Sequence, residues 1–104
     1  MRFHGVDIPK KRIVDFCQRW NITEFALFGS VLRDDFHPGS DVDVLVTFTE
    51  DCGHSLLDLA QMQNELETIL AHKVDLVEKA GLRNPFRKSA ILNNMEIVYA
   101  TGAA

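Results

Sequence analysis

The sequence predicts a small α/β fold in which helices flank a mixed sheet of four strands. Short apolar runs typical of strands alternate with longer segments whose apolar residues recur with the 3.6-residue period of a helix. Turn residues separate these segments, and the expected order is helix, strand, short helix, strand, helix, strand, helix, strand. With 104 residues, the chain has room for one hydrophobic core, so we expect a single domain over residues 1–104.

The first half of the chain is predicted to contain one helix and two strands. Pro9 suits the first turn of a helix that continues to about Arg19, and Asp7 is a candidate for its cap. Cys17 falls among the apolar positions of this helix, so we expect a buried and chemically inert thiol. The segments that follow are a strand at 24–28, a helical turn at 30–35, a Pro-Gly loop at 37–39 and a strand at 41–49.

The second half is predicted to contain two helices, each followed by a strand. Ser55 can cap a helix over 56–71, whose apolar residues follow the helical period. A strand is expected at 73–78. Asn84 and Pro85 begin a short helix that ends at Asn93, and residues 96–100 form the last strand.

The composition is that of an ordinary folded domain. Apolar residues make up 46% of the chain and charged residues 25%, so disorder is not expected. The formal net charge of −4 argues against non-specific nucleic-acid binding, which requires a clustered basic surface. Because there is no long apolar run and no signal-like N-terminus, we expect a cytoplasmic protein without a membrane segment. Cys17 and Cys52 form no disulfide framework, and Cys52 is expected in an ordinary loop.

Two aspartates stand at the start of the strand expected at 41–49. Side chains of a strand alternate between its faces, so Asp41 and Asp43 point to one face and the intervening valines to the other. Two ionised carboxylates repel each other, and burying them in an apolar strand is costly unless a cation lies between them. A divalent cation with oxygen ligands resolves this conflict, and Mg²⁺ suits a site that also holds phosphates. The pair therefore predicts a metal–phosphate site.

A Gly-Ser pair precedes these aspartates by ten residues. Gly29 follows a predicted strand, and its lack of a side chain lets the backbone approach a phosphate closely. The N–H groups that follow and the Ser30 hydroxyl can then donate to that phosphate, and Arg33 can reach the same anion. A Gly-Ser pair on its own is most often an ordinary turn. Its short connection to the two aspartates favours phosphate binding.

Asp75 is a third candidate, because it lies inside the apolar run of a predicted strand. On its own, such an acid is more often a surface residue of an edge strand. If its strand lies beside that of Asp41 and Asp43, the three carboxylates can face one spot. They could then hold two metal ions about 4 Å apart, which would clamp the attacking oxygen and a departing pyrophosphate.

The combination resembles the nucleotidyltransferase superfamily of the DNA polymerase beta type. Its pattern is a Gly-Ser pair, ten residues, Asp-Val-Asp, and a later aspartate in a strand. From Glu24 to Ala100 the chain is similar to the minimal nucleotidyltransferases (MNT), antitoxins that pair with HEPN-domain proteins. The segments that carry the similarity are FGSVLRDDFHPGSDVDVLVTF, LLDLAQMQNELETIL and KVDLVEKAGLRNPFRKSAILNNMEIVYA. Asp34 departs from the family, whose members commonly carry a glycine after the motif arginine.

The resemblance implies a nucleotidyltransferase fold and transfer of AMP from ATP to a tyrosine hydroxyl of a HEPN toxin, which silences its RNase activity. Asp41 and Asp43 would hold two Mg²⁺ ions, and Asp75 would complete one site and help to deprotonate the acceptor. A hetero-oligomer with the toxin is implied as well. The residues implied to bind the nucleotide are Gly29, Ser30, Arg33 and Ser40.

Two other functions remain open at this point. The chain could neutralise a HEPN toxin by contact alone, or it could be one subunit of a two-protein enzyme that modifies a small molecule. The intact set of three aspartates favours catalysis, since a pure binder gains nothing from clustered charge. A chain of 104 residues also leaves no room for a second domain that would hold a small acceptor. We therefore expect a protein to supply the acceptor.

Overall fold

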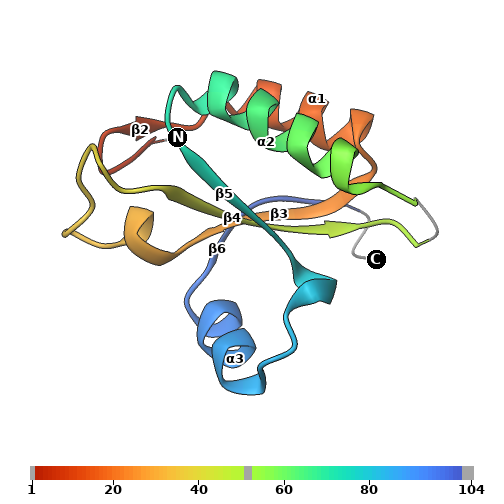
Figure 1. Cartoon of the computed structure of the whole chain (residues 1–104). Coiled ribbons are helices and arrows are strands. Elements are labelled where there is room, and N and C mark those ends of the chain that lie inside the picture. The colour runs from red at the N-terminus through yellow and green to blue at the C-terminus, as the bar shows by residue number, and fades with distance from the viewer. Residues whose placement is uncertain (1, 51–52, 102–104) are drawn as a thin grey trace.

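The computed structural model describes residues 2–50 and 53–101, so Cys52 lies outside these ranges. At its centre is a four-stranded sheet (Figure 1) with the strand order β5–β4–β3–β6. β3 pairs antiparallel with β4 and β6, and β4 pairs parallel with β5. The strands are β3 (Ile22–Phe28), β4 (Val42–Phe48), β5 (Val74–Glu78) and β6 (Glu96–Ala100). The predicted mixed sheet is confirmed, and no strand end differs from its expected position by more than two residues.

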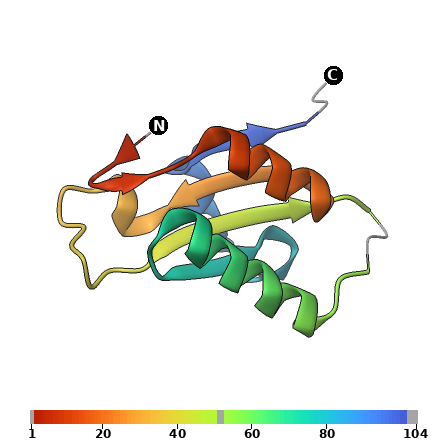
Figure 2. The ribbon, with the colours of Figure 1, turned by 90° about the horizontal axis from the view of Figure 1, so that it is seen from above.

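Helices cover both faces of this sheet. α1 (Lys10–Arg19) and α2 (Leu56–Leu70) lie side by side across one face, as the view from above shows (Figure 2). α3 (Pro85–Asn93) lies against the other face (Figure 1). The larger core cluster lies under α1 and α2, and a smaller one, next to α3, consists of Ala26, Phe28, Leu45, Leu82 and Ile91. No helix within the described ranges is long and apolar enough to cross a membrane.

Local hydrogen bonds explain where α2 and α3 begin. The Ser55 hydroxyl accepts a hydrogen bond from the backbone N–H of Asp58, whose carboxylate accepts one from the N–H of Ser55. The Asn84 side chain accepts from the N–H groups of Phe86 and Arg87. These caps satisfy backbone donors that have no partner inside the helix. Both helices therefore begin where the sequence predicts.

The N-terminal residues form a short hairpin that the sequence analysis missed. β1 (Arg2–Phe3) pairs with β2 (Val6–Asp7), and the turn residues His4 and Gly5 have φ angles of 46° and 89°. Asp7 pairs with Arg2 in this hairpin. The prediction that Asp7 caps α1 is therefore wrong, and the N-cap is Pro9, which makes no capping hydrogen bond.

Alternation along β4 decides which face of the sheet carries its aspartate. Val42, Val44 and Val46 are fully buried in the cluster under α1 and α2. Leu45 belongs to the cluster on the opposite face, next to α3. Asp43, two residues before Leu45, points to that same face. The fold thus places Asp43 at one end of the sheet, on the side of α3.

Candidate active site

Three strand ends meet around Asp43. β3 ends at Phe28, and β4 and β5 both begin here. In the register of the sheet, Asp43 is paired with Phe28 of β3 on one side and with Asp75 of β5 on the other. The N–H of Val42 donates to the carbonyl of Lys73 at 2.8 Å, which holds the two strand starts together. The structure thus contains the parallel pairing that brings Asp75 beside the Asp-Val-Asp segment.

The carboxylates lie at the exposed end of the sheet rather than in its core. Asp41 and Asp75 are exposed and Asp43 is half-buried, and no polar or charged residue in the described ranges is fully buried. The expectation of buried carboxylates is therefore wrong, because water reaches the point where β4 and β5 begin. Burial raises the pKa of Asp43, and the negative charges of Asp75 and Asp41 raise it further. The positive charges of Arg33 and Arg87 act in the opposite direction on this pKa.

Gly29 is required where the chain leaves β3. Its φ is +73°, a left-handed conformation that favours glycine. A Cβ atom added to Gly29 would lie 2.1 Å from Oδ2 and 3.1 Å from Cγ of Asp43. The Asp43 carboxylate therefore packs against the backbone of the Gly-Ser turn, which brings the two parts of the sequence motif into contact. Ser30 follows, half-buried, in the short 3₁₀ helix η1 (Gly29–Leu32).

A pocket of about 460 Å³ opens beside this turn. Its volume falls in the range of ligand sites, roughly 300–1,000 Å³. Arg33, the predicted anion contact, lines the pocket, and its Nε also pairs with Oδ1 of Asp35 at 3.2 Å. One wall comes from β3 and η1 and the other from α3, with the lining residues Phe28, Gly29, Leu32, Arg33, Arg87, Ala90, Ile91 and Asn94.

Arg87 is a pocket residue that the sequence analysis missed. It shares one face of α3 with Ala90 and Ile91, which follow it at helical spacing, and Asn94 lines the pocket just after the helix ends. The motif spacing does not point to Arg87, since α3 is a separate element beyond β5. The only signal is electrostatic, because a cation in the first turn of a helix opposes the helix macrodipole. The helix itself therefore gains nothing from the positive charge of Arg87.

Ser40, a predicted nucleotide contact, lies in the turn that leads into Asp41. Its N–H donates to the carbonyl of His37 at 2.8 Å, and its hydroxyl accepts from the N–H of His37 at 3.3 Å. The Ser40 carbonyl is 2.6 Å from Nε2 of His72. These contacts hold the turn before the aspartates. Nucleotide binding by Ser40 stays a prediction.

The donor set fits Mg²⁺ that is shared with phosphates rather than a closed protein cage. In the ranges that the structure describes, no three His, Cys, Asp or Glu side chains are grouped closely enough to hold an ion. Asp43 and Asp75 nevertheless offer two carboxylates from paired positions, and the Asp43 carboxylate lies where a side chain at Gly29 would otherwise be. Mg²⁺ is commonly bound by one or two carboxylates together with substrate phosphates and water. The residues present are therefore suitable ligands.

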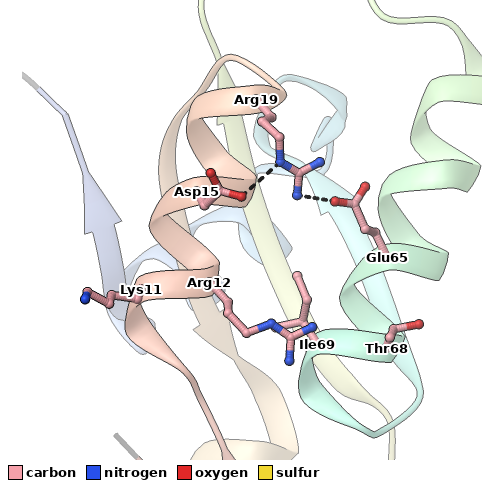
Figure 3. Close-up of a pocket in the computed structure, with 7 residues that line it drawn as sticks. All are labelled: Lys11, Arg12, Asp15, Arg19, Glu65, Thr68 and Ile69. Atoms are coloured by element: carbon pink, nitrogen blue, oxygen red, sulfur yellow. Dashed lines mark hydrogen bonds and ion pairs between the residues drawn. The ribbon is translucent and has the colours of Figure 1, made fainter.

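A second groove, of about 410 Å³, lies between α1 and α2 on the far face of the sheet (Figure 3). Arg19 spans it by pairing with Asp15, at 3.1 Å, and with Glu65. Lys11 and Arg12 line the same groove. None of the residues of the Gly-Ser and aspartate motif reaches it, so this groove is separate from the candidate active site.

Comparison with known proteins agrees with the resemblance seen in the sequence. Residues 10–98 match the nucleotidyltransferase domain family. The protein adenylyltransferase MntA of Thermococcus cleftensis is 37% identical over 82 residues, which cover 79% of this chain and 78% of MntA.

Solved structures share the fold. One described as a "putative minimal nucleotidyltransferase" has a TM-score of 0.70 at 33% identity. The match covers 84% of this chain and 86% of the chain in that structure. A chain from the tri-AMPylated Shewanella oneidensis HEPN toxin in complex with MNT antitoxin has a TM-score of 0.64 at 17% identity, with coverages of 88% and 70%. The second likeness concerns the fold alone. The chain therefore belongs to the nucleotidyltransferase domain family and is a nucleotidyltransferase related to MntA.

Proposed function

We propose that this protein transfers AMP from ATP to a tyrosine hydroxyl of a HEPN toxin, with Mg²⁺, and thereby acts as the antitoxin of that toxin. The observation that carries the proposal is the pairing of Asp43 with Asp75 next to Gly29, which sets two carboxylates beside a turn suited to phosphate. The related MntA is a protein adenylyltransferase. A chain from the solved complex of a tri-AMPylated HEPN toxin with its MNT antitoxin has the same fold as this protein.

In this proposal the triphosphate binds where the Gly-Ser turn meets the aspartates. Gly29 lets the Asp43 carboxylate lie directly against this turn, and the N–H and hydroxyl groups of Ser30 would donate to the phosphate oxygens. Asp41, Asp43 and Asp75 would hold Mg²⁺, which neutralises charge on the phosphates when bound. Arg33 adds a guanidinium on the side of the pocket. In this arrangement the α-phosphorus would lie at the exposed end of the sheet, where a protein acceptor would have access.

The reaction is a displacement at the α-phosphorus. The acceptor oxygen forms a new bond to phosphorus, the bond from the α-phosphorus to the bridging oxygen breaks, and pyrophosphate leaves with that electron pair. The proton of the acceptor hydroxyl passes to the carboxylate of Asp75, which is exposed and can release it to water. Positioning and charge neutralisation account for most of the catalysis, because little covalent chemistry falls to the protein.

The test is a transfer assay with a HEPN protein encoded beside this chain, ATP and MgCl₂, read by intact-protein mass spectrometry. We expect AMP additions on the HEPN protein, mapped to tyrosine. Asp43→Asn and Asp75→Asn should reduce the rate by roughly 100-fold or more, since each removes a charge that acts on the reacting phosphate. Asp34→Asn is the matched control, because Asp34 is exposed in the loop between η1 and β4.

The same assay tests the alternative in which the protein neutralises its partner by contact alone. If the wild type leaves the HEPN protein unmodified and the Asp43→Asn variant still neutralises it fully, adenylyl transfer is the wrong account. If the aspartate variants lose both modification and neutralisation while Asp34→Asn keeps both, binding alone is excluded. AMP found on a small molecule but never on the HEPN protein would indicate a small-molecule enzyme.

A further inference from the structure

Arg87 lines the pocket beside Gly29, and its backbone is held in place by the first turn of α3. The Asn84 side chain accepts hydrogen bonds from the N–H groups of Phe86 and Arg87, at 2.9 and 3.1 Å. This cap fixes the first turn of α3, and with it the backbone from which the Arg87 side chain extends. Ile91, one turn further along the same face, is buried against the sheet. The position of the Arg87 backbone is therefore well defined.

The structure gives Arg87 no role in stabilising the fold. The first turn of α3 contains no acidic residue, and a cation there opposes the helix macrodipole. Within residues 2–50 and 53–101, Arg87 takes part in no ion pair, whereas Arg33 across the pocket pairs with Asp35. Arg87 is thus a charged side chain on a ligand-sized pocket without an anionic partner of its own.

The surroundings of Arg87 indicate the anion that it would bind. Gly29 and Arg33 line the same pocket, and both belong to the turn that packs against Asp43. A phosphate chain whose first phosphorus is at Asp43 would extend into the pocket between Arg33 and Arg87.

We propose that Arg87 binds the β- and γ-phosphates of the nucleotide, opposite Arg33, and so holds the pyrophosphate as it leaves. This inference rests on the proposed nucleotidyl transfer. When the bond at the α-phosphorus breaks, negative charge builds up on the pyrophosphate. A planar guanidinium can meet two phosphate oxygens at once, which a lysine cannot do. Arg87 therefore contributes to nucleotide affinity and to the stability of the leaving group.

The test compares the affinities of ATP, pyrophosphate and AMP, each with Mg²⁺, by calorimetry on the full chain. In Arg87→Ala, we expect ATP and pyrophosphate to bind about 10- to 100-fold more weakly, the loss typical of a charged hydrogen-bonded contact. The affinity for AMP should change by less than about 2-fold, because AMP lacks the β- and γ-phosphates that Arg87 would contact. Arg87→Lys keeps the positive charge but loses the planar guanidinium. Its affinities for ATP and pyrophosphate should lie between those of the wild type and those of Arg87→Ala.

Arg83→Ala is the matched control, because Arg83 is an exposed arginine just before α3 and does not line the pocket. It should bind all three ligands like the wild type. The inference is overturned if Arg87→Ala leaves the affinities for ATP and pyrophosphate unchanged, or if AMP is weakened as much as ATP. Equal weakening of AMP would mean that Arg87 contacts the nucleoside or the α-phosphate.

The outcome is separable from that of the proposed function. Suppose that the wild type modifies its HEPN partner and that Arg87→Ala binds ATP and pyrophosphate as the wild type does. Then only the role of Arg87 is refuted, and the proposed function stands. A chain that never modifies the partner, yet loses ATP and pyrophosphate affinity in Arg87→Ala, refutes protein adenylylation and supports the phosphate contact. A wild type that binds neither ATP nor pyrophosphate contradicts both.

Discussion

The Cα atom of Gly29 lies directly against the carboxylate of Asp43. A side chain at Gly29 would place its Cβ 2.1 Å from Oδ2 of Asp43, and the φ of +73° already disfavours any residue except glycine. The Gly-Ser turn and the start of β4, which a loop separates in the sequence, are therefore in van der Waals contact. The shape of the site depends on this contact.

Gly29→Ala should damage the site more than the fold. The left-handed φ costs an alanine about 1–2 kcal/mol, and Asp43 must move away from the new Cβ. A displacement of about 1 Å in a reacting geometry can cost roughly 100-fold in rate. AMP transfer and urea unfolding, measured on the same preparation, give the two effects separately.

Gly5→Ala is the matched control for backbone strain. Gly5 has a φ of +89°, but no atom lies within 4 Å of a Cβ built there. We expect a similar loss of stability without a loss of activity. If Gly5→Ala and Gly29→Ala reduce the transfer rate equally, the contact between Gly29 and Asp43 is not what matters for catalysis.

Asp43→Asn should stabilise the protein when no metal is bound. Burial and the charges of Asp75 and Asp41 all disfavour the ionised form of Asp43, so a neutral side chain of the same shape relieves an unfavourable interaction. Thermal unfolding in EDTA should show a higher Tm for the variant at neutral pH. Asp34→Asn, an exposed change of equal charge, should alter the Tm less. A lower Tm for Asp43→Asn would contradict the repulsion among the three aspartates.

The capping box of α2 predicts an effect on stability. Ser55→Ala removes the hydroxyl that accepts from the N–H of Asp58 and should lower the free energy of unfolding by about 1 kcal/mol. Urea unfolding at neutral pH measures this change. Because Ser55 does not line the pocket beside Gly29, ATP binding should stay the same. A variant as stable as the wild type would mean that the cap contributes nothing.

The same cap predicts a pH dependence. The hydrogen bond from the backbone N–H of Ser55 lowers the pKa of Asp58 below its ordinary value of 3.8. The ionised form is thus favoured in the folded state, and its contribution is present at neutral pH and is lost as the pH falls through the folded pKa. Asp58→Asn should therefore be less stable than the wild type at neutral pH. The difference should shrink at pH values below 3.8.

Cys17 should be chemically inert in the folded protein. It is fully buried in α1, and burial raises its pKa to about 12. Since the thiolate is the reactive form, iodoacetamide at neutral pH should leave Cys17 unmodified until denaturant is added. Peptide mass spectrometry resolves this residue from Cys52. Labelling of Cys17 without denaturant would show that α1 opens readily.

Sequence patterns were sufficient for the regular elements and insufficient for the N-terminus. The helical period and the cap at Ser55 predicted α2 from its first residue, because both signals are local. The hairpin of β1 and β2 was missed because strands of two residues are too short to show a period. The mistaken cap at Asp7 followed from that omission, because Asp7 belongs to β2 and the N-cap position of α1 falls on Pro9.

By itself, the sequence determined the turn at Gly29 and Ser30, the aspartates of β4 and the presence of Asp75 in a strand, because these features depend on neighbouring residues. Tertiary structure alone decided that Asp75 pairs with Asp43 and that Arg87 faces the same pocket. It also decided that the carboxylates lie at an exposed sheet end. Which strands become neighbours depends on packing between segments that are distant in the sequence, and local patterns do not specify that packing.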